Sequence, residues 1–121
     1  MIHPKEKAQA YKAHTTKING KTFIKFAGLL TLAHAKGDLS ITTELITLDR
    51  ETGFVLFKAT ASVTLKDDSI VSFTGHGDAS PKNVSKMIAP HLIRMAETRA
   101  IARALRFLVG CPYTAIEELN Q

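Results

Sequence analysis

Strict alternation of side-chain type over residues 57–66 is the feature of this sequence that most constrains its fold. The apolar residues of this stretch are Phe57, Ala59, Ala61, Val63 and Leu65, and the polar ones between them are Lys58, Thr60, Ser62, Thr64 and Lys66. Successive side chains of a β-strand point to opposite faces of a sheet, so this pattern predicts a strand with one buried face and one exposed face. Neighbouring strands are expected to complete the sheet.

Two such strands are predicted. Residues 39–48 are rich in β-branched side chains, and a change of phase between Ile41 and Ile46 indicates a β-bulge. The polar segment 49–53, which ends in glycine, is typical of a hairpin loop. A second polar turn leads to a third strand at 70–74, so we expect a three-stranded antiparallel sheet.

One longer helix is expected before these strands and another after them. Residues 26–36 carry apolar side chains at helical spacing and are followed by a glycine that can cap the helix. A Ser-Pro pair predicts a short helix over 80–87, and a glycine-rich connection precedes it. The last helix is expected to begin at 88–90 and to end at Val109, because Gly110 stops it.

These elements predict an α+β fold with a short helix, a three-stranded antiparallel sheet and a long C-terminal helix packed on the sheet, a ββ-β-α core. The 121 residues suffice for one domain, which we expect over 20–110. Residues 1–19 would form a basic arm or short helix, and 111–121 a C-terminal tail. The lone cysteine, Cys111, is expected to be a reduced packing residue. No apolar stretch suits a membrane span or secretory signal, so we expect a cytoplasmic protein without membrane contact.

The excess of basic over acidic residues in the chain favours a polyanionic partner. Sixteen lysines and arginines against eleven acidic residues give a formal net charge of +5. In the last helix, Arg99, Arg103 and Arg106 are separated by four and three residues and form one stripe. The apolar residues of the helix fall on the opposite side, so the arginines are expected to face solvent. Guanidinium groups bind phosphates and stack on exposed bases, which predicts a site for single-stranded nucleic acid.

Four lysines extend this candidate site. Lys82 and Lys86 follow the glycine-rich connection and continue the positive track toward the start of the last helix. Lys58 and Lys66 lie on the outward face of the central strand. For each of these residues the alternative is a solvated surface charge without a ligand.

The order and spacing of several segments resemble the Rad-fifty-two and Erf superfamily of single-strand annealing proteins. The segments are 32–37, 63–69, 75–77 and 96–106, and the likeness extends over roughly residues 20–110. The resemblance implies a core that oligomerises, often into rings, and that holds single-stranded DNA in a groove with its bases exposed for annealing.

The resemblance also implies roles for individual residues. Arg103 and Arg106 match the basic positions through which the superfamily binds the DNA backbone. A lysine that often precedes the first of these arginines is replaced here by Ala102. Larger members bind recombinases through a long C-terminal tail; we expect no counterpart of this tail here, and the recombinase partner is unknown.

We therefore expect a non-enzymatic single-stranded DNA-binding protein of recombination, repair or replication. It would anneal or protect strands as a homo-oligomer, with a ring among the expected forms, and without a cofactor or metal. Three alternatives stay open. A double-stranded RNA-binding module has a similar element order. A structural oligomer would pair the arginines with carboxylates of a neighbouring subunit. A metal-dependent nuclease would take its ligands from Glu44, Asp67, Asp68 and Asp78.

Overall fold

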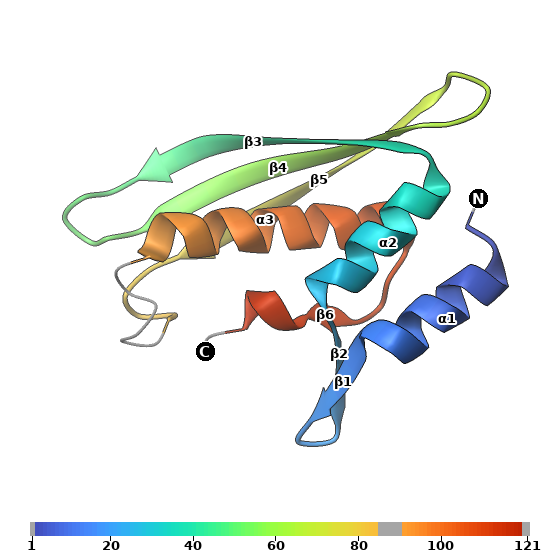
Figure 1. Ribbon diagram of the computed structural model, residues 1–121. Helices are drawn as coiled ribbons and strands as arrows, with labels where there is room; N and C mark the ends of the chain where they lie inside the picture. The colour runs from blue at the N-terminus through green and yellow to red at the C-terminus, as the bar shows by residue number, and fades with distance from the viewer. Residues whose placement is uncertain (1, 85–90, 120–121) are drawn as a thin grey trace.

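The long C-terminal helix α3 (Leu92–Val109) lies along one face of a three-stranded sheet, and the smaller elements pack beneath it (Figure 1). The strands of this sheet are β3 (Asp38–Leu48), β4 (Val55–Thr64) and β5 (Ile70–Ala79). This computed structural model describes residues 2–84 and 91–119. The predicted α+β architecture is confirmed.

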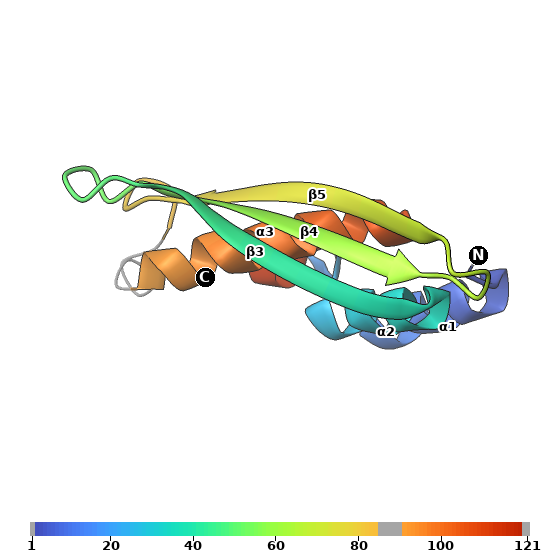
Figure 2. The ribbon, with the colours of Figure 1, turned by 90° about the horizontal axis from the view of Figure 1, so that it is seen from above.

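Strand β4 is the central strand and pairs antiparallel with both neighbours, so β3 and β5 form the edges of the sheet (Figure 2). Its odd-numbered residues are buried and its even-numbered residues are half-buried, as the alternation predicted. The register of β3 against β4 shifts between Leu45 and Thr47, which confirms the predicted bulge.

Strand β5 is longer than predicted, because it continues through Gly75 and Gly77 instead of ending at residue 74. Both glycines lie directly under α3. A Cβ atom at Gly75 would lie 2.4 Å from the backbone nitrogen of Ala104, and one at Gly77 would lie 2.2 Å from that of Ala100. The two glycines therefore do not form a turn; they let the helix backbone approach the strand closely.

Helix α2 (Phe26–Lys36) matches its predicted bounds, and α3 ends at Val109 as expected. Gly110 adopts a left-handed conformation with φ of 67° and caps α3 through its backbone N–H. The predicted start of this helix at 88–90 lies outside the described residues. Residues 81–84 form turns and bends instead of the predicted short helix, whose remainder is also outside the described residues. No described helix has the length and apolar character needed to cross a membrane.

The two ends of the chain form a second sheet. Helix α1 (Pro4–His14) leads into a hairpin of β1 (Thr15–Ile18) and β2 (Lys21–Ile24), whose turn residues Asn19 and Gly20 both have positive φ, as type I′ turns require. Strand β6 (Thr114–Ala115) pairs in parallel with β2 and is followed by the short helix η2 (Ile116–Glu118).

Both terminal segments contribute to the main core. Ala10 of α1 and Ala115 of β6 are buried in the same cluster as Leu29, Val63 and Leu105. The described parts of the expected arm and tail are therefore packed elements of the molecule. Their apolar residues show no clear helical or strand periodicity, which is why the sequence did not indicate this packing.

Candidate nucleic-acid interface

Arg99 is buried, with 6% of its surface exposed, and does not face solvent as expected. Its Nε donates to the carbonyl of Glu118 at 2.9 Å, and its Nη1 donates to the carbonyl of Asp78 at 2.8 Å. Its Nη1 and Nη2 also donate to the side-chain and backbone oxygens of Asn83. Burial, with a smaller effect of the nearby Arg103, lowers the pKa of the Arg99 guanidinium from its ordinary value. Arg99 therefore joins three segments of the fold and is not available to a phosphate.

Arg103 and Arg106 share the carboxylate of Glu118. The Nε of Arg103 donates to Oε1 of Glu118 at 3.0 Å, and its Nη1 donates to the carbonyl of His76 at 2.9 Å. Nη1 of Arg106 lies 3.8 Å from Oε2 of Glu118, and its Nη2 donates to the carbonyl of Pro112 at 3.3 Å. The Glu118 side chain is 4% exposed, whereas those of Arg103 and Arg106 are 38% and 25% exposed. We call these three arginines and Glu118 the arginine cluster.

The C-terminal segment is the reason that the predicted solvent-facing stripe is wrong. Residues 111–119 fold back under α3, where β6 pairs with β2 and the backbone nitrogen of Ala115 donates to Oε2 of Glu118 at 2.9 Å. Oε1 of Glu117 accepts from the backbone nitrogen of Phe26 at 2.9 Å, at the start of α2. Helical periodicity identifies one face that packs on the sheet, but it does not reveal a second covering layer from elsewhere in the chain. The two adjacent glutamates at 117 and 118 were the one feature of the sequence that indicated this covering layer.

The four predicted lysines do not join the arginines on one surface. Lys58 lies on the outer face of β4, between Glu44 of β3 and His76 of β5 in the register of the sheet. Lys66 is exposed at the turn between β4 and β5, and Lys82 is exposed in the loop after β5. Lys86 lies outside the described residues.

The carboxylates proposed for a nuclease are also dispersed. Asp67 and Asp68 occupy the turn at one end of β4 and β5, whereas Asp78 pairs with Leu56 near the other end. Glu44 lies on β3 opposite Lys58. Within residues 2–84 and 91–119, no three His, Cys, Asp or Glu side chains are grouped so that they could hold a metal ion.

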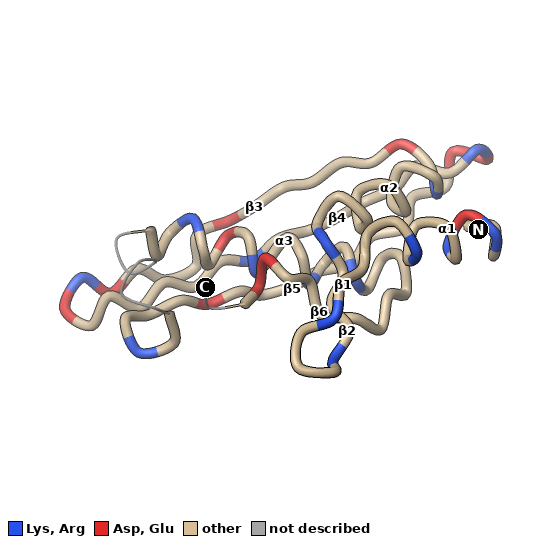
Figure 3. The backbone as a smooth tube through the Cα atoms, turned by 60° about the horizontal axis from the view of Figure 1, so that its bottom comes forward, with Lys and Arg blue, Asp and Glu red and all other residues tan. Residues whose placement is uncertain are grey.

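The net positive charge of the chain lies in its N-terminal part, most of which was expected to form a basic arm or short helix outside the main domain. Residues 2–25 contain six lysines and one carboxylate, Glu6, for a net charge of +5, while the rest of the chain has equal numbers of cationic and anionic residues. Figure 3 shows the basic positions along α1 and the β1–β2 hairpin. We call the exposed members of this set the N-terminal lysines: Lys5, Lys12, Lys17, Lys21 and Lys25.

The N-terminal lysines are held on ordered elements. Lys17 and Lys21 flank the tight turn of the hairpin, and Lys21 Nζ lies 5.9 Å from the ring centroid of Phe23. Lys5 and Lys12 are seven residues apart, which places them on the same side of α1. Among the described residues, none of the N-terminal lysines forms a salt bridge. Their charge is therefore available to an external anion.

An aromatic contact fixes α1 to the C-terminal segment. The rings of Tyr11 and Tyr113 meet edge to face with centroids 5.3 Å apart. Burial, reinforced by the neighbouring Cys111, raises the pKa of the Tyr11 hydroxyl well above its ordinary value. Cys111 is a free, buried thiol, as expected. Helix α1, which carries two of the N-terminal lysines, is thus anchored to the C-terminal segment.

No protein-family model matches this chain, and no curated protein matches it either. The grounds for a function are therefore the fold and the distribution of charge. The resemblance to the single-strand annealing superfamily stays an expectation.

Proposed function

We propose that this protein binds single-stranded DNA through its N-terminal lysines and catalyses no reaction on it. The observation that carries the proposal is the confinement of the whole net charge of +5 to residues 2–25, where one carboxylate accompanies six lysines. Exposed lysines attract phosphates as point charges and read no base sequence. Binding is expected to be independent of sequence and to weaken with salt.

The arginine cluster has a structural part in this proposal. Arg99 is buried, and Arg103 and Arg106 hold the C-terminal segment through Glu118. Their remaining exposure adds to the positive field around the molecule, but they are not the primary contacts. The lysines at 58, 66 and 82 lie on other surfaces and are assigned no contact.

Annealing or protection of strands in recombination, repair or replication is the task that we propose. The aromatic residues near the N-terminal lysines are not free to stack on bases, because Phe23 is buried and Tyr11 is half-buried against Tyr113. A surface that binds the DNA backbone and does not stack on the bases keeps the bases accessible to a complementary strand. We further propose that the protein acts as a homo-oligomer.

Competition among nucleic acids tests this function. Fluorescence anisotropy of a labelled single-stranded DNA is followed while unlabelled single-stranded DNA, duplex DNA or duplex RNA is added at one fixed salt concentration. We expect single-stranded DNA to compete most strongly. Duplex RNA as the strongest competitor would replace this proposal with the double-stranded RNA-binding alternative, and no binding at low salt would overturn both.

A cleavage assay distinguishes the enzyme alternative. The labelled strand is incubated with the protein and Mg²⁺ or Mn²⁺ and then separated by size. We expect the strand to stay intact, because the candidate carboxylates lie at different places on the main sheet. Metal-dependent shortening of the strand would support the nuclease instead.

A further inference from the structure

Two exposed aromatic side chains lie in one hollow at the end of α3. The chain has six phenylalanines and two tyrosines, all of them among the described residues, and only Phe73 and Phe107 are exposed. Phe107 of α3 is 60% exposed, and Phe73 of β5 is 38% exposed. Both line a hollow of about 280 Å³, together with the half-buried Ile2. Exposed apolar surface that is gathered in one place is typical of a binding site.

The packing of α3 on β5 places both rings at the end of the helix. The backbones of the two elements are in close contact at Gly75 and Ala104. Phe73 is two residues from Gly75 and on the same face of the strand. Phe107 is three residues from Ala104 and one turn nearer the end of the helix. Both rings are therefore carried by backbone that is fixed in the main core contact of the fold.

Two ammonium groups make this hollow positive. Nζ of Lys36 donates to the carbonyl of Leu108 at 2.9 Å, and Nζ of Lys7 lies 3.5 Å from the position of a Cβ atom at Gly110. The C-terminus of a helix carries only about half a negative charge, which two lysines exceed. No carboxylate lines the hollow, and neither lysine forms a salt bridge with a described residue. The hollow therefore attracts an anion.

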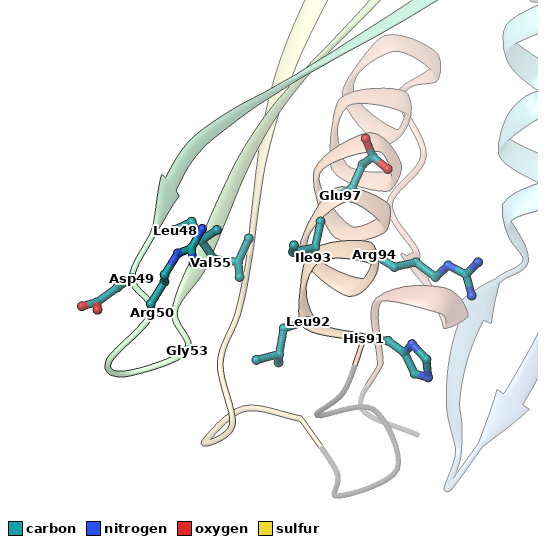
Figure 4. Close-up of a pocket in the computed structure, with 10 residues that line it drawn as sticks. All are labelled: Leu48, Asp49, Arg50, Gly53, Val55, His91, Leu92, Ile93, Arg94 and Glu97. Atoms are coloured by element: carbon teal, nitrogen blue, oxygen red, sulfur yellow. The ribbon is translucent and has the colours of Figure 1, made fainter.

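The larger groove beside β3 has a different character. Figure 4 shows this groove between the end of β3 and the first turns of α3. Two carboxylates and two guanidinium groups line it, so these side chains add no net charge: Asp49, Glu97, Arg50 and Arg94. No phenylalanine or tyrosine lines it. Ile93, which is 51% exposed in this groove, is therefore a control position without an aromatic ring or a positive surrounding.

A nucleotide combines the two chemical groups that the hollow accepts. A nucleobase has a flat π face that stacks on an aromatic side chain, and a phosphate binds lysine ammonium groups. Sites for small molecules usually have volumes of about 300–1,000 Å³. A hollow of about 280 Å³ is at the lower end of this range and suits one base. An apolar peptide segment would cover the rings but leave the two ammonium groups without a partner.

We propose that this hollow binds one nucleotide of the single-stranded DNA, with the base against the rings of Phe73 and Phe107 and the phosphate at Lys7 and Lys36. This inference rests on the proposed function and adds a base-binding subsite to it. Lys7 is two residues from Lys5, on the opposite side of α1, so a strand bound at Lys5 reaches the hollow around the first turn of the helix. The other bases of the strand stay accessible for annealing.

A tryptophan probe tests whether a base enters the hollow. The chain has no tryptophan, so the fluorescence of Phe107→Trp reports on this one position, and a base that stacks on the indole ring quenches it. The variant is titrated with oligothymidylate and with an abasic strand of the same length, which carries the phosphates without the bases. We expect only oligothymidylate to quench Phe107→Trp, and neither strand to quench Ile93→Trp. Equal quenching by both strands, no quenching by either, or equal quenching of both variants would overturn the inference.

Affinities for the same two strands test the contribution of the ring. Phe107→Ala is expected to weaken the binding of oligothymidylate roughly ten-fold, because a base loses its stacking partner, and to leave the affinity for the abasic strand unchanged. Ile93→Ala is the matched control and should change neither affinity. Circular dichroism checks the fold, and Phe107→Leu, which keeps an apolar side chain without a ring, replaces Phe107→Ala if that variant fails to fold. An unchanged affinity for oligothymidylate, or an equal loss with both strands, would overturn the subsite.

The same probes separate this inference from the proposed function. A wild type that binds both strands equally well, with no effect of Phe107→Ala, would overturn the subsite and leave the DNA proposal standing. Quenching of Phe107→Trp by thymidine monophosphate, without any binding of single-stranded DNA at low salt, would overturn the DNA proposal and leave a nucleotide site in the hollow. Binding of neither probe would overturn both.

Discussion

Arg103 donates its Nε to the Oε1 of Glu118 at 3.0 Å, and this ion pair joins α3 to the segment that folds back beneath it. The same carboxylate lies close to Arg106 and accepts from the backbone of Ala115. The arginine stripe of α3 has a spacing that suggests a phosphate-binding track. In the structure it instead connects two layers of the fold. The structure moves the candidate interface to the N-terminal lysines.

Replacement of Glu118 by glutamine is expected to destabilise the protein. Glu118→Gln keeps the shape and an acceptor for the backbone but removes the charge that two partly buried arginines share. Removing one partner of such an ion pair leaves the charges of the other partners uncompensated. Because the arginines are partly exposed, we expect the free energy of unfolding to fall by only roughly 2–3 kcal/mol. The decrease in the free energy of unfolding is measured by urea denaturation. Glu51→Gln, in the exposed loop after β3, should change stability by less than about 0.5 kcal/mol; equal effects of the two changes would contradict this role of Glu118.

Arg99→Lys is expected to lower the free energy of unfolding by roughly 3 kcal/mol, because an ammonium group does not reproduce the several directed hydrogen bonds of the buried guanidinium. Arg50→Lys, at an exposed loop position, serves as the control and should be nearly neutral. Thermal and urea unfolding check both variants. A stable Arg99→Lys variant with weakened DNA binding would restore Arg99 as a DNA contact.

The close approach of α3 to β5 makes Gly77 intolerant of a side chain. In Gly77→Ala, the new Cβ would lie 2.2 Å from the backbone nitrogen of Ala100, so the helix must move away from the strand. We expect a loss of at least about 2 kcal/mol. Gly20→Ala meets no atom within 4 Å and should cost only about 1–2 kcal/mol for its positive φ. A larger loss at Gly20 than at Gly77 would show that the packing is looser than described.

The turn between β4 and β5 contains a carboxyl with a lowered pKa. Hydrogen bonds from the side chain and backbone of Ser69 hold the pKa of Asp67 below its ordinary value. A carboxyl whose pKa is lowered by folding stabilises the folded state above its ordinary pKa of about 3.9, and that contribution is lost as the pH falls through the folded-state pKa. Ser69→Ala should raise the Asp67 pKa, as followed by NMR titration of the carboxyl carbon, whereas Ser72→Ala should leave it unchanged.

The main sheet and the bounds of α2 could be predicted from the sequence because they depend on local patterns. Alternation in β4, a phase change in β3 and glycines at helix ends each reflect a direct geometric requirement of the backbone. The length of β5 could not be predicted in this way. Gly75 and Gly77 have the composition of a turn, and only the position of Ala100 and Ala104 shows that they lie under a helix.

The candidate site was hard to predict for the same reason as the length of β5: both depend on which other segment of the chain packs against them. The spacing of Arg99, Arg103 and Arg106 shows that they share a face but not what covers it, and their cover begins five residues after the last of them, at Cys111. The concentration of lysines before residue 26 was visible in the sequence. Its significance depends on α1 and the hairpin being ordered and the arginines being paired, and both are properties of the tertiary structure.

The salt dependence of DNA binding tests the central claim most directly. Affinity for single-stranded DNA is measured over a range of salt concentrations for the wild type, for Lys12→Gln/Lys17→Gln/Lys21→Gln, and for the matched variant Lys58→Gln/Lys66→Gln/Lys82→Gln. Each phosphate contact contributes about 0.7 to the slope of log affinity against log salt. The account predicts a slope shallower by about 2 for the N-terminal variant and little change for the matched one. The reverse pattern, or equal changes in both variants, would contradict it.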